Sequence, residues 1–456
     1  MTATPGQEPW LSWSPARAVF RLGLPLAIAM ASHALINVVD MALIGRLGAD
    51  AIAAAHVATT INFLPMILGQ CVSIALLSRL SRQLGGGGVE RARTFHRRSE
   101  WFLFWLGIVI GVATALPAAW CVDTTGIEGT VRAAAIEYLV VCNLGCLPMF
   151  VLMGTTTAMR AVGETAMPLF LLLGANALNL GLDLVLLFGW PALGIPSIGV
   201  VGAAWATVIA RVLAAIVAVA WLLRRRHPLS LRGTADIAMP VARPLLADAV
   251  PQVVQIGLRG LVVWGLTVAV QQRGGADALA AIGITTRLDT MVLFGAIGFA
   301  SAATTIAGRA VMQGNGVRAR AAGLWAGIQA CLFGGVLVVL FWCCREDVVL
   351  LFLPQAGVGV VAAAALYLGV AALAHPIGAF ALGAIGAVQG AGRMVAPLAV
   401  DLVGFLVLGV LLATAAQNGD GLLPVFWALV GGTAVLAAAH LAFLLRANWT
   451  RPVAPH

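Results

Sequence analysis

Residues 48–54 read Gly-Ala-Asp-Ala-Ile-Ala-Ala, and residues 275–281 read Gly-Ala-Asp-Ala-Leu-Ala-Ala. Two further pairs of segments match at the same or nearly the same separation along the chain: Arg91-Ala-Arg93 with Arg318-Ala-Arg320, and Ala161-Val-Gly163 with Gly390-Ala-Gly392. Three matches at a nearly constant separation indicate an internal repeat. The chain is therefore expected to consist of two halves built on one plan.

Long apolar segments surround these repeats. The protein is 61% hydrophobic and 10% charged, with a mean hydropathy of +0.99, which excludes a soluble globular protein. Apolar runs of about 20 residues can cross a bilayer as helices. We count twelve such runs, at 20–43, 52–80, 99–120, 134–158, 166–189, 200–223, 245–271, 278–308, 322–344, 358–387, 394–415 and 424–446. The sequence therefore predicts an all-α membrane protein with twelve transmembrane helices.

Six of these helices fall in each half of the chain. The predicted domains are an N-terminal six-helix lobe at 1–226, a cytosolic linker at 227–243 and a C-terminal six-helix lobe at 244–456. An even number of spans gives both halves the same orientation, so we expect a pseudo-two-fold axis along the membrane normal. Transporters with parallel repeats have this design, although channels and membrane enzymes can also contain repeats.

Most of the positive charge lies in alternate loops. The net charge is +9, and every basic residue other than histidine is arginine. Arginines cluster at 79–98, 224–243 and 309–320, whereas the intervening loops carry acids. This positive-inside pattern predicts a multi-pass membrane protein with both termini in the cytosol. The basic surplus is explained by membrane topology, so we expect no nucleic-acid partner.

Two aspartates interrupt long apolar segments, each with an asparagine at helical spacing. Asn37 and Asp40 share one helix face, as do Asn179 and Asp183, and Asn176 extends the second stripe by one turn. A charge at the bilayer centre costs at least roughly 2.5–3.5 kcal/mol. Carboxyl and amide oxygens can coordinate a hard cation, and a buried carboxyl can hold a proton. We therefore predict an ion or proton site; the alternative is that these groups only hydrogen-bond helices together.

Two other residues of the first half are candidates for the same machinery. Thr207 offers a hydroxyl in the segment 200–223, although a helical threonine commonly bonds its own backbone. Pro25 lies about four turns before Asp40, where it removes a backbone hydrogen bond and allows the helix to bend. We predict a gating role for Pro25, the alternative being a passive kink.

The second half carries a different set of charges. At the positions that the repeat relates to Asn179 and Asp183 it has Leu408 and Leu412. The charged candidates within its apolar segments are Arg259, Asp289 and Asp401. Unpaired charges are costly in a membrane, so we expect an ion pair within this lobe or a contact with the substrate cavity. The ion pair is the favoured interpretation.

The sequence resembles the multidrug and toxic compound extrusion (MATE) transporters. The matching segments are the run from Pro25 through Asn37-Val-Val-Asp40 to Ala54, the turn Arg160–Pro168, the stripe Asn176–Asp183, Gly202–Thr207 and Gln389-Gly-Ala-Gly392. They span nearly the whole chain, and their joint order is specific, although each is weak alone. The resemblance implies two six-helix bundles in a V-shaped arrangement and cation-coupled export of amphipathic, often cationic, organic compounds.

The resemblance also implies roles for particular residues. In the prokaryotic branch with an amino-terminal acid site, the cation or proton is held by groups that correspond here to Asp40, Asn179, Asp183 and Thr207. Pro25 matches the proline associated with bending of the first helix. Arg259 stands where the NorM-like branch has a seventh-helix glutamate, so the chain looks more like the DinF-like branch, with coupling expected in the first lobe only.

The expected function is thus a secondary antiporter, with proton and sodium both open as the coupling ion. The alternative is a lipid-linked precursor flippase of a related fold, which would have a more cationic cavity. An intramembrane enzyme or receptor would show catalytic His/Asp/Cys groupings or a soluble sensing domain, and the sequence shows neither. We expect a monomer that is not an enzyme and needs no cofactor. Its partners would be a small drug-like substrate, H+ or Na+, and the lipid bilayer.

Overall fold

The computed structural model describes residues 8–224, 227–233, 241–345, 347, 357–418 and 421–449. Across these residues the regular structure is helical, apart from one isolated bridge between Trp190 and Ile195. Twelve helices in this part of the chain are long and apolar enough to cross a membrane. Helices suit this setting because they satisfy their backbone hydrogen bonds internally, where lipid offers none. The prediction of an all-α protein with twelve transmembrane helices is confirmed.

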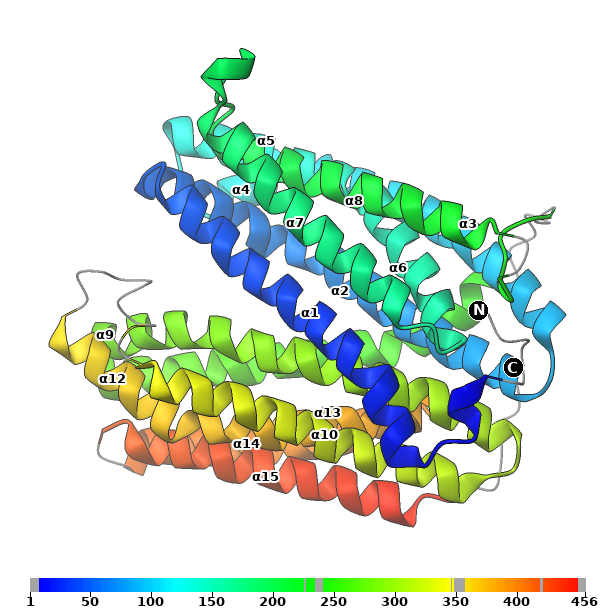
Figure 1. Ribbon diagram of the computed structural model, residues 1–456. Helices are drawn as coiled ribbons and strands as arrows, with labels where there is room; N and C mark the ends of the chain where they lie inside the picture. Colours follow the sequence, from blue (N-terminus) through cyan, green and yellow to red (C-terminus); the bar gives the residue numbers. More distant parts are fainter. Residues whose placement is uncertain are drawn as a thin grey trace. The chain divides into compact units, whose positions relative to one another are not determined.

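The chain forms two compact units, and the first contains Leu35–Leu80 and Gly87–Ala249. Its helices are the last third of α1 (Pro15–Gly45), most of α2 (Ala49–Gly85), α3 (Val89–Ala115), α4 (Ala118–Asp123), α5 (Gly129–Leu144), α6 (Cys146–Ala161), α7 (Ala166–Phe188), η2 (Pro191–Leu193) and α8 (Val200–Leu222). In Figure 1, α7 lies along α8, and α3 packs on α6. Alanines let these helices approach, while Leu139 and Leu187 fill the core between them.

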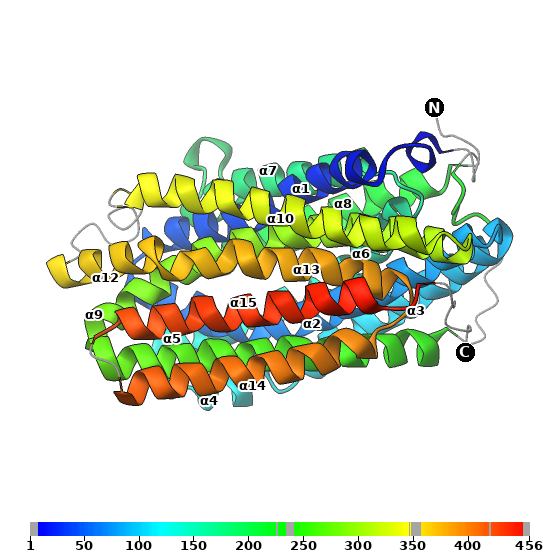
Figure 2. The same cartoon turned by 90° about the horizontal axis from the view of Figure 1, so that it is seen from below.

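The second unit contains Glu8–Ala34, Ser81–Gly86 and the described residues from Val250 onward. Its helices are η1 (Pro9–Leu11), the first two thirds of α1, most of α9 (Ala242–Met312), α10 (Gly316–Cys343), α12 (Val358–Gly369), η3 (Ala371–Leu373), α13 (Ala374–Gly390), α14 (Val395–Asn418) and α15 (Leu423–Arg446). Figures 1 and 2 both show α14 beside α15, and α10 packs along α13. The core is rich in alanine, with Phe299 and Phe426 among its largest members.

The internal repeat is visible in the backbone of both units. The turns after α6 and α13 each contain a glycine, Gly163 or Gly392, with φ of +82°. Gly163 N donates to Arg160 O at 2.9 Å, and Gly392 N donates to Gln389 O at 2.9 Å. Both helices thus end in the same left-handed cap, a conformation that favours glycine because it has no Cβ.

The repeated segments Gly48–Ala54 and Gly275–Ala281 also begin at equivalent helix junctions. Gly48 separates α1 from α2 with φ of +112°. Gly275, with φ of +61°, is the non-helical residue at which α9 divides into two helices. The same glycine position of the repeat therefore lies at the junction between the first and the second span of each half.

Candidate functional site

The two aspartates that the sequence singled out lie in the first unit, on α1 and α7. The Asp40 and Asp183 carboxyl groups are within hydrogen-bonding range of each other. Asp183 is completely buried and Asp40 is half-buried. Apart from their mutual contact, neither oxygen of Asp183 nor Oδ1 of Asp40 has a donor among the described residues. A hydrogen bond between two carboxyl groups requires a proton on one of them, so this geometry suits a site that binds a single proton.

The predicted amide and hydroxyl lie beside this pair. Asn179 precedes Asp183 by one turn of α7 and is buried. Its Nδ2 donates to Thr207 Oγ1 on α8 at 3.3 Å, across the contact between these two helices. The helix spacing therefore brings Asn179 and Asp183 to one face, and the packing of α7 on α8 adds Thr207.

The other two predicted asparagines are placed differently. Asn37 is exposed on α1, and no hydrogen bond to its side chain is present among the described residues. Asn176 is half-buried on α7 and makes an interaction of its own. Their part in an ion site therefore stays a prediction.

Two residues that the sequence reasoning missed complete the surroundings of the carboxyl pair. Tyr138 on α5 is buried and interacts electrostatically with both Asp40 and Asp183. Arg211, one turn after Thr207 on α8, acts on Asp40 through its positive charge. Signals for both were present: Tyr138 is one of only two tyrosines in the chain, and Arg211 interrupts the apolar segment 200–223.

Two acids of the second unit, Asp289 and Asp401, have histidine partners. Asp401 on α14 is completely buried, and its Oδ1 lies 2.7 Å from His440 Nε2 on α15. Gln255 Nε2 on α9 donates to the other oxygen at 2.9 Å. Asp401 therefore joins three helices of this unit.

Asp289 on α9 is bound in a similar way. Tyr367 Oη donates to Asp289 Oδ2 at 2.5 Å, and His375 Nε2 lies 2.8 Å from Oδ1. The expected ion pair of Arg259 with these acids is wrong: in the described part of the chain Arg259 forms no ion pair. The tertiary packing brought histidines, which lie far away in the sequence, to both carboxylates instead.

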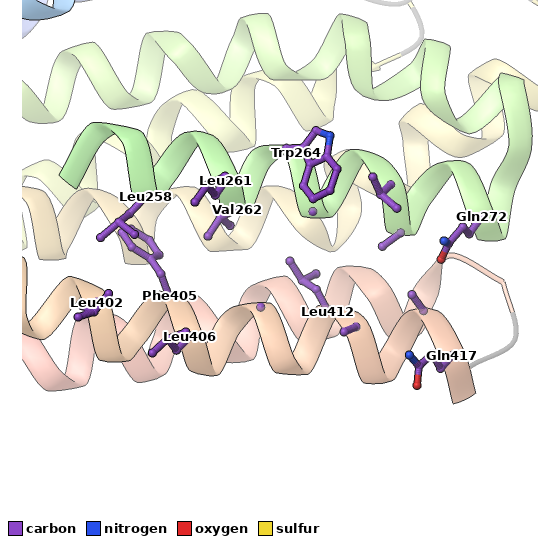
Figure 3. A pocket seen from close by; sticks show the side chains of 16 residues that line it. Leu258, Leu261, Val262, Trp264, Gln272, Leu402, Phe405, Leu406, Leu412 and Gln417 are labelled. Carbon is purple, nitrogen blue, oxygen red and sulfur yellow. The ribbon is translucent and has the colours of Figure 1, made fainter. Parts of the chain in front are cut away.

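An apolar groove of about 410 Å³ runs between α9 and α14 in the second unit (Figure 3). Leu261, Trp264, Phe405 and other apolar side chains line most of it, and the amides of Gln272 and Gln417 lie at one end. Leu412, the repeat counterpart of Asp183, also lines this groove. The same repeat position is thus acidic in the first unit and apolar in the second.

Comparison with known proteins identifies the family. The MatE family model matches residues 25–185 and 264–414, one segment in each half and more than half of the chain. The multidrug resistance protein NorM of Burkholderia vietnamiensis is 27% identical, with 91% of each chain covered. The probable multidrug resistance protein YoeA of Bacillus subtilis is 24% identical over 73% of this chain and 72% of its own.

Solved structures of transporters share the fold. A MOP superfamily transporter from Pyrococcus furiosus superposes with a TM-score of 0.88 at 20% identity, covering 98% of both chains. A multidrug resistance MATE family transporter in an outward-facing conformation gives 0.86 at 21% identity, again covering 98% of both. At these identities the likeness establishes the fold alone. Together with the family match to both halves, it means that this protein belongs to the MatE family of multidrug and toxic compound extrusion transporters.

Proposed function

We propose that the protein is a proton-coupled antiporter that exports amphipathic, cationic organic compounds by alternating access. The observation that carries this proposal is the contact between the carboxyl groups of Asp40 and Asp183, which requires one proton. Several relatives are named multidrug resistance proteins, which supports drug-like organic compounds as the substrate class.

In the proposed cycle, protons from outside neutralise the carboxyl pair and substrate leaves outward. Without a proton, two carboxylates would repel each other, which favours a different packing of α1 against α7. Asn179 and Thr207 would hold the α7 and α8 side of the site in place. Pro25 is the proposed bending position of α1 because it lacks a backbone donor. Coupling then follows from the different proton affinities of the two conformations.

The number of ligands supports the choice of the proton over sodium. A hard metal cation needs several oxygen ligands, whereas the positive charge of Arg211 disfavours any cation at Asp40 and does not discriminate between the two ions. A proton shared between two carboxyl oxygens needs only those oxygens. The surroundings of the pair therefore favour a proton as the coupling ion.

The same proposal includes a membrane topology. The arginine-rich loops at 79–98, 224–243 and 309–320 favour a topology with both termini and the 227–243 linker in the cytosol. The proposed protein is a monomer of the inner membrane. The lobes 1–226 and 244–456 would be the two elements that move during alternating access, with coupling in the first.

Transport into proteoliposomes tests the coupling. A fluorescent amphipathic cation is offered while either a pH gradient or a sodium gradient is imposed. We expect the pH gradient to drive transport by the wild type and the sodium gradient to have no effect. Asp40→Asn removes the shared proton site, so we expect it to abolish proton-driven transport while the protein still inserts.

Asp123→Asn is the matched control. Asp123 is an exposed acid outside the spans, and its ion pair with Arg132 holds its pKa below the usual value. Exposed pairs of this kind contribute little to stability, so this variant should transport like the wild type. Full proton-driven transport by Asp40→Asn, or transport driven by sodium alone, would contradict the proposal.

A further inference from the structure

A second titratable pair is buried in the first unit, on α3. His96 is completely buried and Glu100, one turn later, is 8% exposed. His96 Nε2 lies 3.5 Å from Glu100 Oε2. Neither Glu100 oxygen has a hydrogen-bond donor in the described part of the chain. The Glu100 carboxyl points against α6, where a Cβ on Gly154 would lie 2.4 Å from Oε2.

The hydrogen bond of the other His96 nitrogen determines how the pair must be protonated. His96 Nδ1 lies 3.1 Å from the carbonyl oxygen of Leu229, which can only accept. Nδ1 therefore carries the hydrogen, and Nε2 is bare when the ring is neutral. A bare nitrogen facing a carboxylate is repulsive, so the contact with Glu100 needs one proton. That proton sits either on the carboxyl or on the ring.

The helix packing itself does not require this pair. In the second half, the repeat places Gly323 and Gly327 of α10 at the positions of His96 and Glu100. Both glycines pack closely against α13, and Gly383 there corresponds to Gly154. Small residues thus join α10 to α13, whereas the first half keeps two polar groups at the same place. Burying polar groups is costly, so their presence indicates a role beyond packing.

Leu229 belongs to a segment that lies against α3, which we call the linker strap and define as residues 227–233. Arg93 Nε donates to Pro228 O at 3.0 Å, and Arg97 Nε donates to Ser230 O at 3.2 Å. The Leu229 side chain is completely buried. Arg93, His96 and Arg97 of α3 thus contact three consecutive carbonyl groups of the strap, with the Leu229 carbonyl in the middle.

A second anchor holds the start of the linker strap. His227 Nε2 lies 3.3 Å from Glu164 Oε2 in the turn after α6. The charged and titratable side chains that act on His96 or hold the strap are Arg93 and Arg97 on α3, and Glu164 with His227. The arginines keep their charge near neutral pH, so pH can act on the strap through His96 and Glu100 or through His227 and Glu164, which the Glu100→Gln variant distinguishes.

We propose that His96 and Glu100 form a proton-binding site, separate from Asp40 and Asp183, whose occupancy fixes the linker strap to α3. When the proton leaves, the ring relieves its repulsion with the Glu100 carboxylate by moving its remaining hydrogen from Nδ1 to Nε2. Leu229 O then loses its donor, and the strap detaches from α3. By linkage, a docked strap binds the proton more tightly than a detached one. This proposal holds whichever ion drives transport.

Hydrogen–deuterium exchange of the full-length protein tests the proposal. The amides of the linker strap are followed from about pH 6 to about pH 9, after correction for intrinsic exchange rates. We expect strong protection at low pH and roughly tenfold faster exchange at high pH, the factor that corresponds to one hydrogen bond. Protection that stays constant over this range would overturn the proposal.

Two variants distinguish the effect of the proton on this pair from a general effect on the fold. Glu100→Gln has the shape of the protonated acid and a permanent donor to Nε2, so the strap should stay protected at every pH. Glu137→Gln changes an exposed glutamate on α5 and should keep the wild-type transition. If Glu100→Gln retains the pH transition, the proton does not reside on this pair and the proposal fails.

Discussion

At the residue scale, the two aspartates of the carboxyl pair receive different support. A charge on Asp40 has Arg211 nearby, whereas a charge on Asp183 would be completely buried with no donor among the residues that the structure describes. A single proton shared by the pair avoids both an uncompensated buried charge and the repulsion of two carboxylates. The pair is therefore suited to bind and release one proton.

Thr207 tests the amide and hydroxyl side of this site. Thr207→Val removes the acceptor for Asn179 Nδ2 but keeps the shape of the side chain. Loss of one such hydrogen bond costs about 0.5–1.5 kcal/mol, so we expect proton-driven transport to fall by up to roughly tenfold. Thr207→Ser keeps the hydroxyl and should restore the rate in the same proteoliposome assay. Equal rates for both variants would exclude a role for this hydrogen bond.

At the element scale, glycines set how closely the helices of the second unit approach. A Cβ on Gly386 of α13 would lie 2.2 Å from the carbonyl oxygen of Ala300 on α9. Thr304 Oγ1 also donates to Gly386 O at 2.8 Å, which shows how near the two backbones are. Any larger residue must push these helices apart.

Gly386→Ala is therefore expected to destabilise the protein. Overpacking a helix contact costs about 1–3 kcal/mol, so the melting temperature in detergent should fall. Gly431→Ala on α15 is the control, because a Cβ there meets open space within 4 Å. That substitution should leave the melting temperature unchanged or raise it, since alanine favours a helix. An unchanged melting temperature for Gly386→Ala would show that α9 and α13 can separate freely.

The start of the chain is an element whose place depends on distant residues. Trp10 in η1 is buried, and Arg309 Nη1 forms an ion pair with Glu8 at 2.8 Å. Arg318 donates to the carbonyl groups of Trp10 and Trp13 at 3.0 and 2.9 Å. These arginines belong to α9 and α10, about three hundred residues away, so no local sequence pattern could predict the contact.

At the scale of the whole molecule, the two halves share a plan but differ in their buried polar groups. The first unit contains the carboxyl pair, whereas the second has Leu408 and Leu412 at the repeat positions of Asn179 and Asp183. Its acids, Asp289 and Asp401, are bound by histidines of the same unit. The two units therefore use their buried acids differently: in the second unit, Asp289 and Asp401 join helices.

Asp401→Asn tests whether this acid has a structural role and no role in coupling. The substitution weakens the contacts with His440 and Gln255, so we expect a loss of about 1–3 kcal/mol and a lower melting temperature. Proton-driven transport per folded molecule should stay close to that of the wild type. If transport loses its dependence on the pH gradient while the fold is intact, a coupling site would lie in the second unit as well.

The sequence by itself determined the helical class, the twelve spans, the repeat and the two aspartates. Short stretches of sequence specify these features, because apolar length, glycine positions and i,i+4 spacing act within one helix or turn. It also placed Asn179 and Asp183 on one face of α7.

Only the tertiary structure decided which groups meet across helices. It brought Asp40 to Asp183 and added Arg211 beside them. It paired Asp401 with His440, where the sequence favoured Arg259, and it set the Leu229 carbonyl against His96. The physical reason is that a partner across a helix contact depends on the rotation and packing of both helices, which no spacing within one segment specifies.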